Sequence, residues 1–159
     1  MATVAIESIS PETTYAHGQK LAFYLKPGDV VCLSGDLGQG KTLFTKGIVA
    51  ALKSDELVTS PTFSLLNIYT GKYYDENLLI YHFDLYRLDH EEQLEDIGFN
   101  EYVFADGVSI IEWPDKFLDC LPNEYLWVEI TSGSVPERRQ LKLCPHGKRY
   151  EELCRELTL

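Results

Sequence analysis

Short apolar runs alternate with amphipathic segments along most of this chain, a pattern typical of α/β proteins. The run Val30–Ser34 is predominantly apolar and follows the turn residues at 27–29, so it is predicted to be a short buried strand. The segment Lys41–Leu52 carries apolar residues at helical spacing and is predicted to be a helix. The pattern therefore predicts a strand that turns sharply into a helix.

Three further helices are predicted. Ser10 as N-cap, followed by Pro11, begins a helix that runs to about Leu25. A short acidic helix is predicted over Glu91–Ile97 and a closing helix over Tyr150–Leu157.

Five other segments are β-like. The first two are predicted to form an antiparallel hairpin with turn residues at 70–72 and 75–77, and the last two a second hairpin. The segments are Val58–Tyr69, Leu78–Phe83, Val108–Ile111, Tyr125–Thr131 and Arg139–Cys144. Together the elements predict one α/β domain over residues 1–159, with a mixed sheet that has a parallel centre and antiparallel hairpin additions.

The loop between the first strand and its helix, residues 35–42, has the spacing Gly-x4-Gly-Lys-Thr of a P-loop. Such a loop aims backbone N–H groups and the positive end of a helix dipole at a phosphate. Lys41 is then expected to reach the β- and γ-phosphates of ATP, and the Thr42 hydroxyl to ligate Mg²⁺. A chance match at a glycine-rich turn is the alternative, but the flanking strand and helix favour a three-layer P-loop NTPase fold. The residues predicted to bind the nucleotide are Asp36, Leu37, Gly38, Gln39, Gly40, Lys41 and Thr42.

Two carboxylates follow apolar strands, Asp84 after residues 78–83 and Glu112 after residues 108–111. Open α/β sheets bind ligands at the carboxyl ends of their strands, and hydrolysis of ATP needs acids that hold Mg²⁺ and orient the nucleophile. The alternative is that each acid only caps a strand at the surface. The spacing alone does not decide which acid meets the metal.

Four other residues have both a functional and a structural interpretation. Thr62 could sense the γ-phosphate or simply begin a strand after proline. His82 could carry protons or pack within its strand. Trp113 could present a stacking ring or only terminate a strand, and Arg87 could pair with phosphate or, as we favour, with a neighbouring acid.

The charge balance and the cysteines limit the function classes. The net charge is −11, with 25 acidic and 14 basic residues, which argues against a chain that grips DNA or RNA by itself. A basic protein partner or ordinary solubility explains the acidic excess equally well. The four cysteines form no Cys-x-x-Cys pair, and no secretory signal or long apolar run is present, so a cytoplasmic protein with reduced thiols and no membrane segment is expected.

Four motifs, in this order, resemble those of one family. They are residues 35–42, Ser60-Pro61-Thr62-Phe63, His82-Phe83-Asp84-Leu85-Tyr86-Arg87-Leu88 and Glu112-Trp113-Pro114. The set resembles TsaE (formerly YjeE), the small bacterial P-loop ATPase needed to form threonylcarbamoyladenosine on tRNA. One departure is Leu43, where the family commonly has a second threonine or serine.

This resemblance implies a protein that binds ATP and Mg²⁺, hydrolyses ATP slowly when alone and acts with the TsaB–TsaD pair, which would hold the tRNA. It implies that Thr42 and Glu112 hold Mg²⁺ and that Asp84 is an essential acid near the γ-phosphate. The residues implied to respond to nucleotide or partner are Tyr86, Arg87 and Trp113. Two other functions remain open from the residues, a small-molecule kinase with the same P-loop and a nucleotide-gated binding module.

Overall fold

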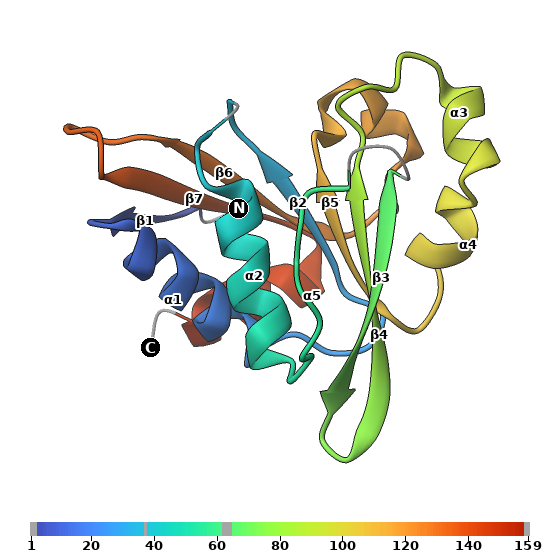
Figure 1. Cartoon of the computed structure of the whole chain (residues 1–159), viewed down its shortest axis with the longest axis horizontal. Helices are drawn as coiled ribbons and strands as arrows, with labels where there is room; N and C mark the ends of the chain where they lie inside the picture. Colours follow the sequence, from blue (N-terminus) through green and yellow to red (C-terminus); the bar gives the residue numbers. More distant parts are fainter. Residues whose placement is uncertain (1–2, 37, 62–64, 158–159) are drawn as a thin grey trace.

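The computed structural model describes residues 3–36, 38–61 and 65–157, and shows a central sheet with helices on both of its faces (Figure 1). Within these residues the sheet has seven strands, β1 (Val4–Ser8), β2 (Val30–Ser34), β3 (Leu66–Tyr73), β4 (Glu76–Asp84), β5 (Val108–Glu112), β6 (Tyr125–Ser132) and β7 (Arg139–His146). The helices are α1 (Pro11–Ala22), α2 (Lys41–Ala51), α3 (Glu91–Asp96), α4 (Phe99–Val103), α5 (Lys148–Leu157) and the 3₁₀ helix η1 (Pro114–Cys120).

The sheet has the order β1-β7-β6-β2-β5-β4-β3. Strand β2 lies between β5 and β6 and is parallel to both, and β4 is parallel to β5. The outer pairs β3–β4, β6–β7 and β1–β7 are antiparallel. The predicted mixed sheet, with a parallel centre and antiparallel hairpins at its sides, is confirmed.

Alternating residues of β2 enter two separate apolar cores, because successive side chains of a strand point to opposite faces of the sheet. Val31 and Leu33 join the core formed with α1, α2 and α5. Val30 and Cys32 join the core formed with α3, α4 and η1. A strand buried on both faces reads as a continuous apolar run, which is why β2 is apolar along most of its length.

Helix α2, which follows the P-loop, is held against α1 at two glycines. A Cβ atom on Gly18 would lie 2.3 Å from the carbonyl oxygen of Phe44, and one on Gly47 would lie 2.1 Å from that of Tyr15. The two helix backbones therefore meet where only glycine fits. This contact fixes the helix whose N-terminus faces the P-loop.

The first hairpin differs from the prediction in where it begins and turns. Residues 58–61 are not in a strand, and β3 runs through the predicted turn at 70–72 before the chain reverses around Asp75. Gly71 is needed for a different reason: a Cβ atom there would lie 2.4 Å from the carbonyl oxygen of Leu52, which also accepts a hydrogen bond from Lys72 N at 2.7 Å. The glycine marks close approach to the end of α2, and the turn prediction at 70–72 was wrong.

The remaining differences from the prediction are smaller. The edge strand β1 and the short helix α4 were not predicted, and α1 ends at Ala22 instead of about Leu25. The last residues before Pro27 form tight turns, with Tyr24 N and Leu25 N donating to carbonyls three residues earlier. Along the part of the chain that the structure describes, no helix combines the length and apolar character needed to cross a membrane.

Candidate functional site

The loop between β2 and α2 depends on glycine at three positions. Gly35, Gly38 and Gly40 have φ angles of +137°, +78° and +104°, which side-chain-bearing residues rarely adopt. A Cβ atom on Gly35 would also lie 2.2 Å from the carbonyl oxygen of Ile130. The chain can therefore bend sharply from the sheet into the N-terminus of α2, as the P-loop spacing predicts.

Lys41, the first residue of α2, folds back over this loop. Its Nζ donates hydrogen bonds to the carbonyl oxygens of Gly35 at 2.5 Å and Asp36 at 2.9 Å. It also lies 4.2 Å from the ring centroid of Trp113. Burial lowers the pKa of Lys41, and the charges of nearby carboxylates, Glu112 first, oppose that shift. The ammonium is thus placed at the mouth of the loop by contacts that a phosphate can replace.

A pocket of about 320 Å³ opens in front of Lys41. Two carboxylates share it with the lysine because β4 and β5 are parallel neighbours in which Asp84 pairs with Glu112. The described residues that line it are Gly38, Gly40, Lys41, Thr42, Leu43, Ser60, Asp84, Glu112 and Trp113. Both strand-end acids therefore lie beside the P-loop, and their predicted roles with Mg²⁺ and the nucleophile stay predictions.

The two acids have different surroundings. Asp84 is partly exposed, and burial together with the charge of Glu112 raises the pKa of its carboxyl, while the hydrogen bond from Tyr86 N at 3.0 Å opposes that change. Glu112 is buried and its Oε2 lies 2.5 Å from Nε2 of His82. Asp84 is therefore the more accessible acid and Glu112 the more tightly held one.

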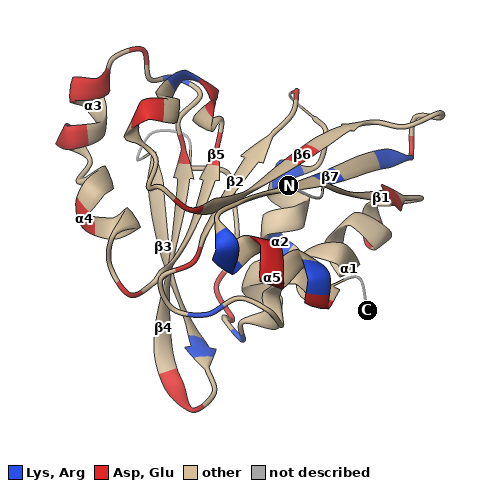
Figure 2. Ribbon diagram, turned by 180° about the vertical axis from the view of Figure 1, so that it is seen from behind, with Lys and Arg blue, Asp and Glu red and all other residues tan. Residues whose placement is uncertain are grey.

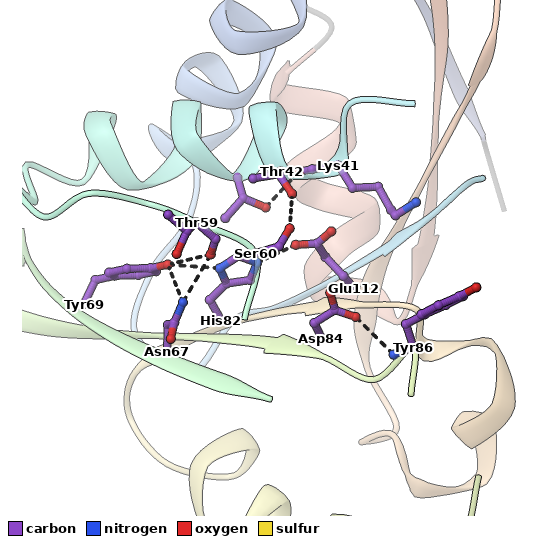
Figure 3. Close-up of polar contacts among 11 residues, drawn as sticks. Lys41, Thr42, Thr59, Ser60, Asn67, Tyr69, His82, Asp84, Tyr86 and Glu112 are labelled. Carbon is purple, nitrogen blue, oxygen red and sulfur yellow. Dashed lines mark hydrogen bonds and ion pairs between the residues drawn. The ribbon is translucent and has the colours of Figure 1, made fainter. Parts of the chain in front are cut away.

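Thr42 lies on the opposite wall of the pocket (Figure 3). Its Oγ1 is 2.6 Å from Oγ of Ser60, in the segment that precedes β3. The hydroxyl of Thr42 and the carboxylates of Asp84 and Glu112 are oxygen donors of the kind that Mg²⁺ prefers. Among the described residues, no three His, Cys, Asp or Glu side chains cluster closely enough to hold a metal alone. The donor set therefore fits a Mg²⁺ ion that also uses phosphate oxygens.

The other residues that the sequence singled out lie in different places relative to the pocket. Leu37 and Thr62 lie outside the described residues. Trp113 lines the pocket and its ring lies 4.8 Å from that of Tyr86, so these two aromatic residues adjoin the site. Arg87 is exposed on the segment after β4. Asp36, Gly38, Gln39 and Gly40 form the loop as predicted.

Sequence reasoning missed one basic residue beside the loop. Nε of Arg139, at the start of β7, donates to the carbonyl oxygen of Gln39 at 3.2 Å, and its Nη2 lies 3.5 Å from that of Gly38. Arg139 also lines a second pocket of about 320 Å³, which adjoins the first at Gly38, Gly40 and Leu43 and reaches Thr14 of α1. Because Arg139 is about 100 residues from the loop in sequence, no local pattern could indicate this contact.

Comparison with known proteins agrees with this geometry. A family model described as "Threonylcarbamoyl adenosine biosynthesis protein TsaE" matches residues 8–141. The chain belongs to the TsaE family. A TsaE protein from Bacillus subtilis is 40% identical over 151 residues, which cover 95% of this chain and 91% of the relative. One from Treponema pallidum is 42% identical over 116 residues, 73% of this chain and 82% of the relative.

A solved structure shows the same fold. The crystal structure of Bacillus subtilis YdiB superposes with a TM-score of 0.78 and 34% identity, covering 99% of this chain and 95% of the other. The resemblance to TsaE drawn from the four motifs is therefore confirmed, together with the α/β P-loop fold.

Proposed function

We propose that this protein binds ATP with Mg²⁺, hydrolyses it slowly and serves in threonylcarbamoyladenosine modification of tRNA together with a TsaB–TsaD complex. The names of its relatives assign them to the biosynthesis of this modified nucleoside. The observation that carries the ATPase proposal is the shared pocket, in which Lys41, Asp84 and Glu112 meet in front of the glycine loop.

Each of these residues has a distinct role in the proposal. The loop amides and Lys41 bind the β- and γ-phosphates, so the lysine exchanges loop carbonyls for phosphate oxygens. Thr42 and Glu112 hold Mg²⁺, which would supply charge neutralisation at the transferred phosphoryl group. Asp84 orients the attacking water, since it is the accessible acid of the pair and its raised pKa makes it a better proton acceptor.

The nucleoside would lie on the Arg139 side of the loop. The second pocket there shares Gly38, Gly40 and Leu43 with the phosphate site, and its wall includes Thr14 from α1. Its volume of about 320 Å³ falls within the range of small-molecule pockets. A triphosphate would then run across the loop from this pocket towards Asp84 and Glu112.

The partner role agrees with the charge of the molecule. Acidic residues occur on α3 and near the β3–β4 turn, and the net charge is −11 (Figure 2). A surface of this sign is unsuited to holding a tRNA phosphate backbone. We therefore propose that the protein meets tRNA only through its partners, in the cytoplasm, and binds neither DNA nor membrane.

The decisive experiment measures phosphate release from Mg·ATP by the purified protein, alone and with reconstituted TsaB–TsaD. Slow release alone and faster release with the partners are the expected results. No release under either condition, with ATP still bound, would support a nucleotide-gated binding module. Robust transfer of phosphate to a metabolite without the partners would favour a small-molecule kinase.

A further inference from the structure

A chain of buried polar side chains runs behind the pocket from Glu112 into the β3–β4 hairpin (Figure 3). His82 on β4 contacts Glu112 through Nε2 at 2.5 Å and the hydroxyl of Tyr69 on β3 through Nδ1 at 3.2 Å. The three residues are 0%, 2% and 4% exposed for His82, Glu112 and Tyr69 respectively. A polar group buried this deeply destabilises the fold unless it is hydrogen-bonded. The hydrogen bonds of these three side chains therefore constrain one another.

One assignment of hydrogens satisfies the whole chain. Nε2–H of His82 donates to the Glu112 carboxylate, and Nδ1 then accepts from the Tyr69 hydroxyl. That hydroxyl also lies 3.4 Å from the carbonyl oxygen of Thr59, and in this assignment its single hydrogen goes to the shorter contact with Nδ1. Burial raises the pKa of Tyr69, so its hydroxyl remains protonated and able to donate. The amide Nδ2 of Asn67 donates to the Tyr69 oxygen at 3.3 Å and to the carbonyl oxygen of Thr59 at 3.2 Å. The chain of bonds therefore continues from β5 to the segment before β3.

The two ends of this chain reach the two proposed ligands of the cation. Glu112 is one ligand. At the other end, Thr59 precedes Ser60, whose hydroxyl lies 2.6 Å from that of the second ligand, Thr42. Side chains on β3 and β4, together with the backbone at residues 59–60, therefore connect two donors that come from β5 and α2.

We propose that His82 and Tyr69 are positioning residues for the cation, which fix the orientation of the Glu112 carboxylate and tie it to the segment that contacts Thr42. The inference rests on the proposed binding of Mg·ATP. Residues that hydrogen-bond a metal-ligating side chain commonly change metal affinity by about 10- to 100-fold when they are replaced.

The test is an equilibrium titration with a fluorescent ATP analogue, performed in EDTA and over a range of Mg²⁺ concentrations. His82→Asn keeps a polar group near Nδ1 but withdraws the donor to Glu112, whereas His82→Gln places an amide near Nε2. We expect His82→Asn to raise the Mg²⁺ concentration for half-maximal effect about tenfold and His82→Gln to keep it within about threefold of wild type. Affinity in EDTA should stay within about twofold for both.

Tyr69→Phe removes only the hydroxyl from the middle of the chain. It should shift the Mg²⁺ midpoint by about threefold, and it should add little to His82→Asn in the double variant, because the two residues act in series. Tyr81→Phe is the matched control, since Tyr81 is a buried tyrosine next to His82 on β4 that packs in the opposite core. That control should leave the midpoint unchanged.

The outcomes separate this inference from the proposed function. If wild type binds no ATP, or binds it independently of Mg²⁺, the proposed function fails before the variants are compared. If wild type responds to Mg²⁺ but His82→Asn does not shift the midpoint, the positioning role is wrong. His82→Asn and His82→Gln could instead raise the Mg²⁺ midpoint equally, with weaker binding in EDTA and a lower unfolding temperature. That result would assign His82 and Tyr69 a purely structural role and overturn the inference.

Discussion

The P-loop and the Glu112 carboxylate face the same pocket, but the chain holds them in place by different means. The loop is shaped mainly by its own glycines and by Lys41, within eight consecutive residues, and Arg139 adds a contact from outside. Glu112 is held by His82 and, through it, by Tyr69, which come from two other strands. One side of the pocket is thus built from local backbone geometry, and the other from side chains that only the folded sheet brings together.

This difference has a consequence for how the two sides respond to mutation. Backbone N–H groups and Lys41 act on phosphates with or without a cation. The side chains around Glu112 act on phosphates only through the cation that Glu112 would hold. Changes in the loop should therefore alter nucleotide affinity in general, whereas changes behind Glu112 should alter only the part that depends on Mg²⁺.

The largest effect is expected for Lys41→Ala. This change removes about two charge-assisted hydrogen bonds to phosphate, each of about 2 kcal/mol, so ATP affinity should fall by about 1000-fold, with and without Mg²⁺. Isothermal calorimetry measures the loss. Lys46→Ala removes an exposed lysine from the same helix and should have no effect. Retained affinity in the Lys41 variant would show that this loop does not bind the triphosphate.

A large effect confined to turnover is expected for Asp84→Asn. An amide cannot accept the proton of the attacking water, so phosphate release should slow by about 100-fold while the dissociation constant for ATP changes by less than about threefold. Single-turnover phosphate release measures the first quantity and a binding titration the second. Asp89→Asn, an exposed neighbour on the same segment, is the control. Normal turnover in the Asp84 variant would mean that another group orients the water.

The raised pKa of Asp84 adds a dependence on pH to the same prediction. An acid that must be ionised loses activity as pH falls through its pKa, and an upward shift moves that loss to higher pH than for an ordinary aspartate. The kcat/KM of wild type should decline about tenfold per pH unit below this point. The residual activity of Asp84→Asn should lack this decline.

The sequence predicted the P-loop side of the pocket better than the contacts that hold Glu112 on the other side. The P-loop, its flanking strand and helix, and the carboxylates at the ends of β4 and β5 were all visible, because glycine spacing and strand-end acids are local signals. Parallel pairing then determines that Asp84 and Glu112 lie side by side. Periodicity can indicate such strands, but it does not state their order in the sheet.

The remaining contacts depend on register and could not be predicted. His82 was ambiguous between packing and function because alternation along β4 gives its face of the sheet but not its partner on β5. The contact of Arg139 with the loop requires β7 to be placed beyond β6. Gly71 was misinterpreted as a turn signal because the carbonyl that approaches it belongs to the end of α2.

A moderate effect that does not depend on Mg²⁺ is expected for Arg139→Ala. Arg139 holds two carbonyl groups of the loop from outside, so its loss should loosen the loop and weaken ATP binding by about fivefold, equally in EDTA and in Mg²⁺. The adjacent Arg138, which pairs with Glu7 at the surface, supplies the matched control as Arg138→Ala. A loss seen only with Mg²⁺ would remove the distinction between the two sides of the pocket.

The smallest effect is expected for Ser60→Ala, which acts on the Thr42 side of the cation. A hydroxyl offers one donor and two lone pairs, so a hydrogen bond from Ser60 leaves Thr42 a lone pair free for Mg²⁺ and restricts where it points. Without Ser60 the Thr42 hydroxyl can rotate, and the Mg²⁺ midpoint of ATP binding should rise by about threefold, with affinity in EDTA unchanged. Ser54→Ala, in the same connecting segment, is the control. A lower Mg²⁺ midpoint would instead mean that Ser60 and the cation compete for the Thr42 hydroxyl. The segment at residues 59–60 would then weaken the Thr42 ligand while it supports the Glu112 ligand.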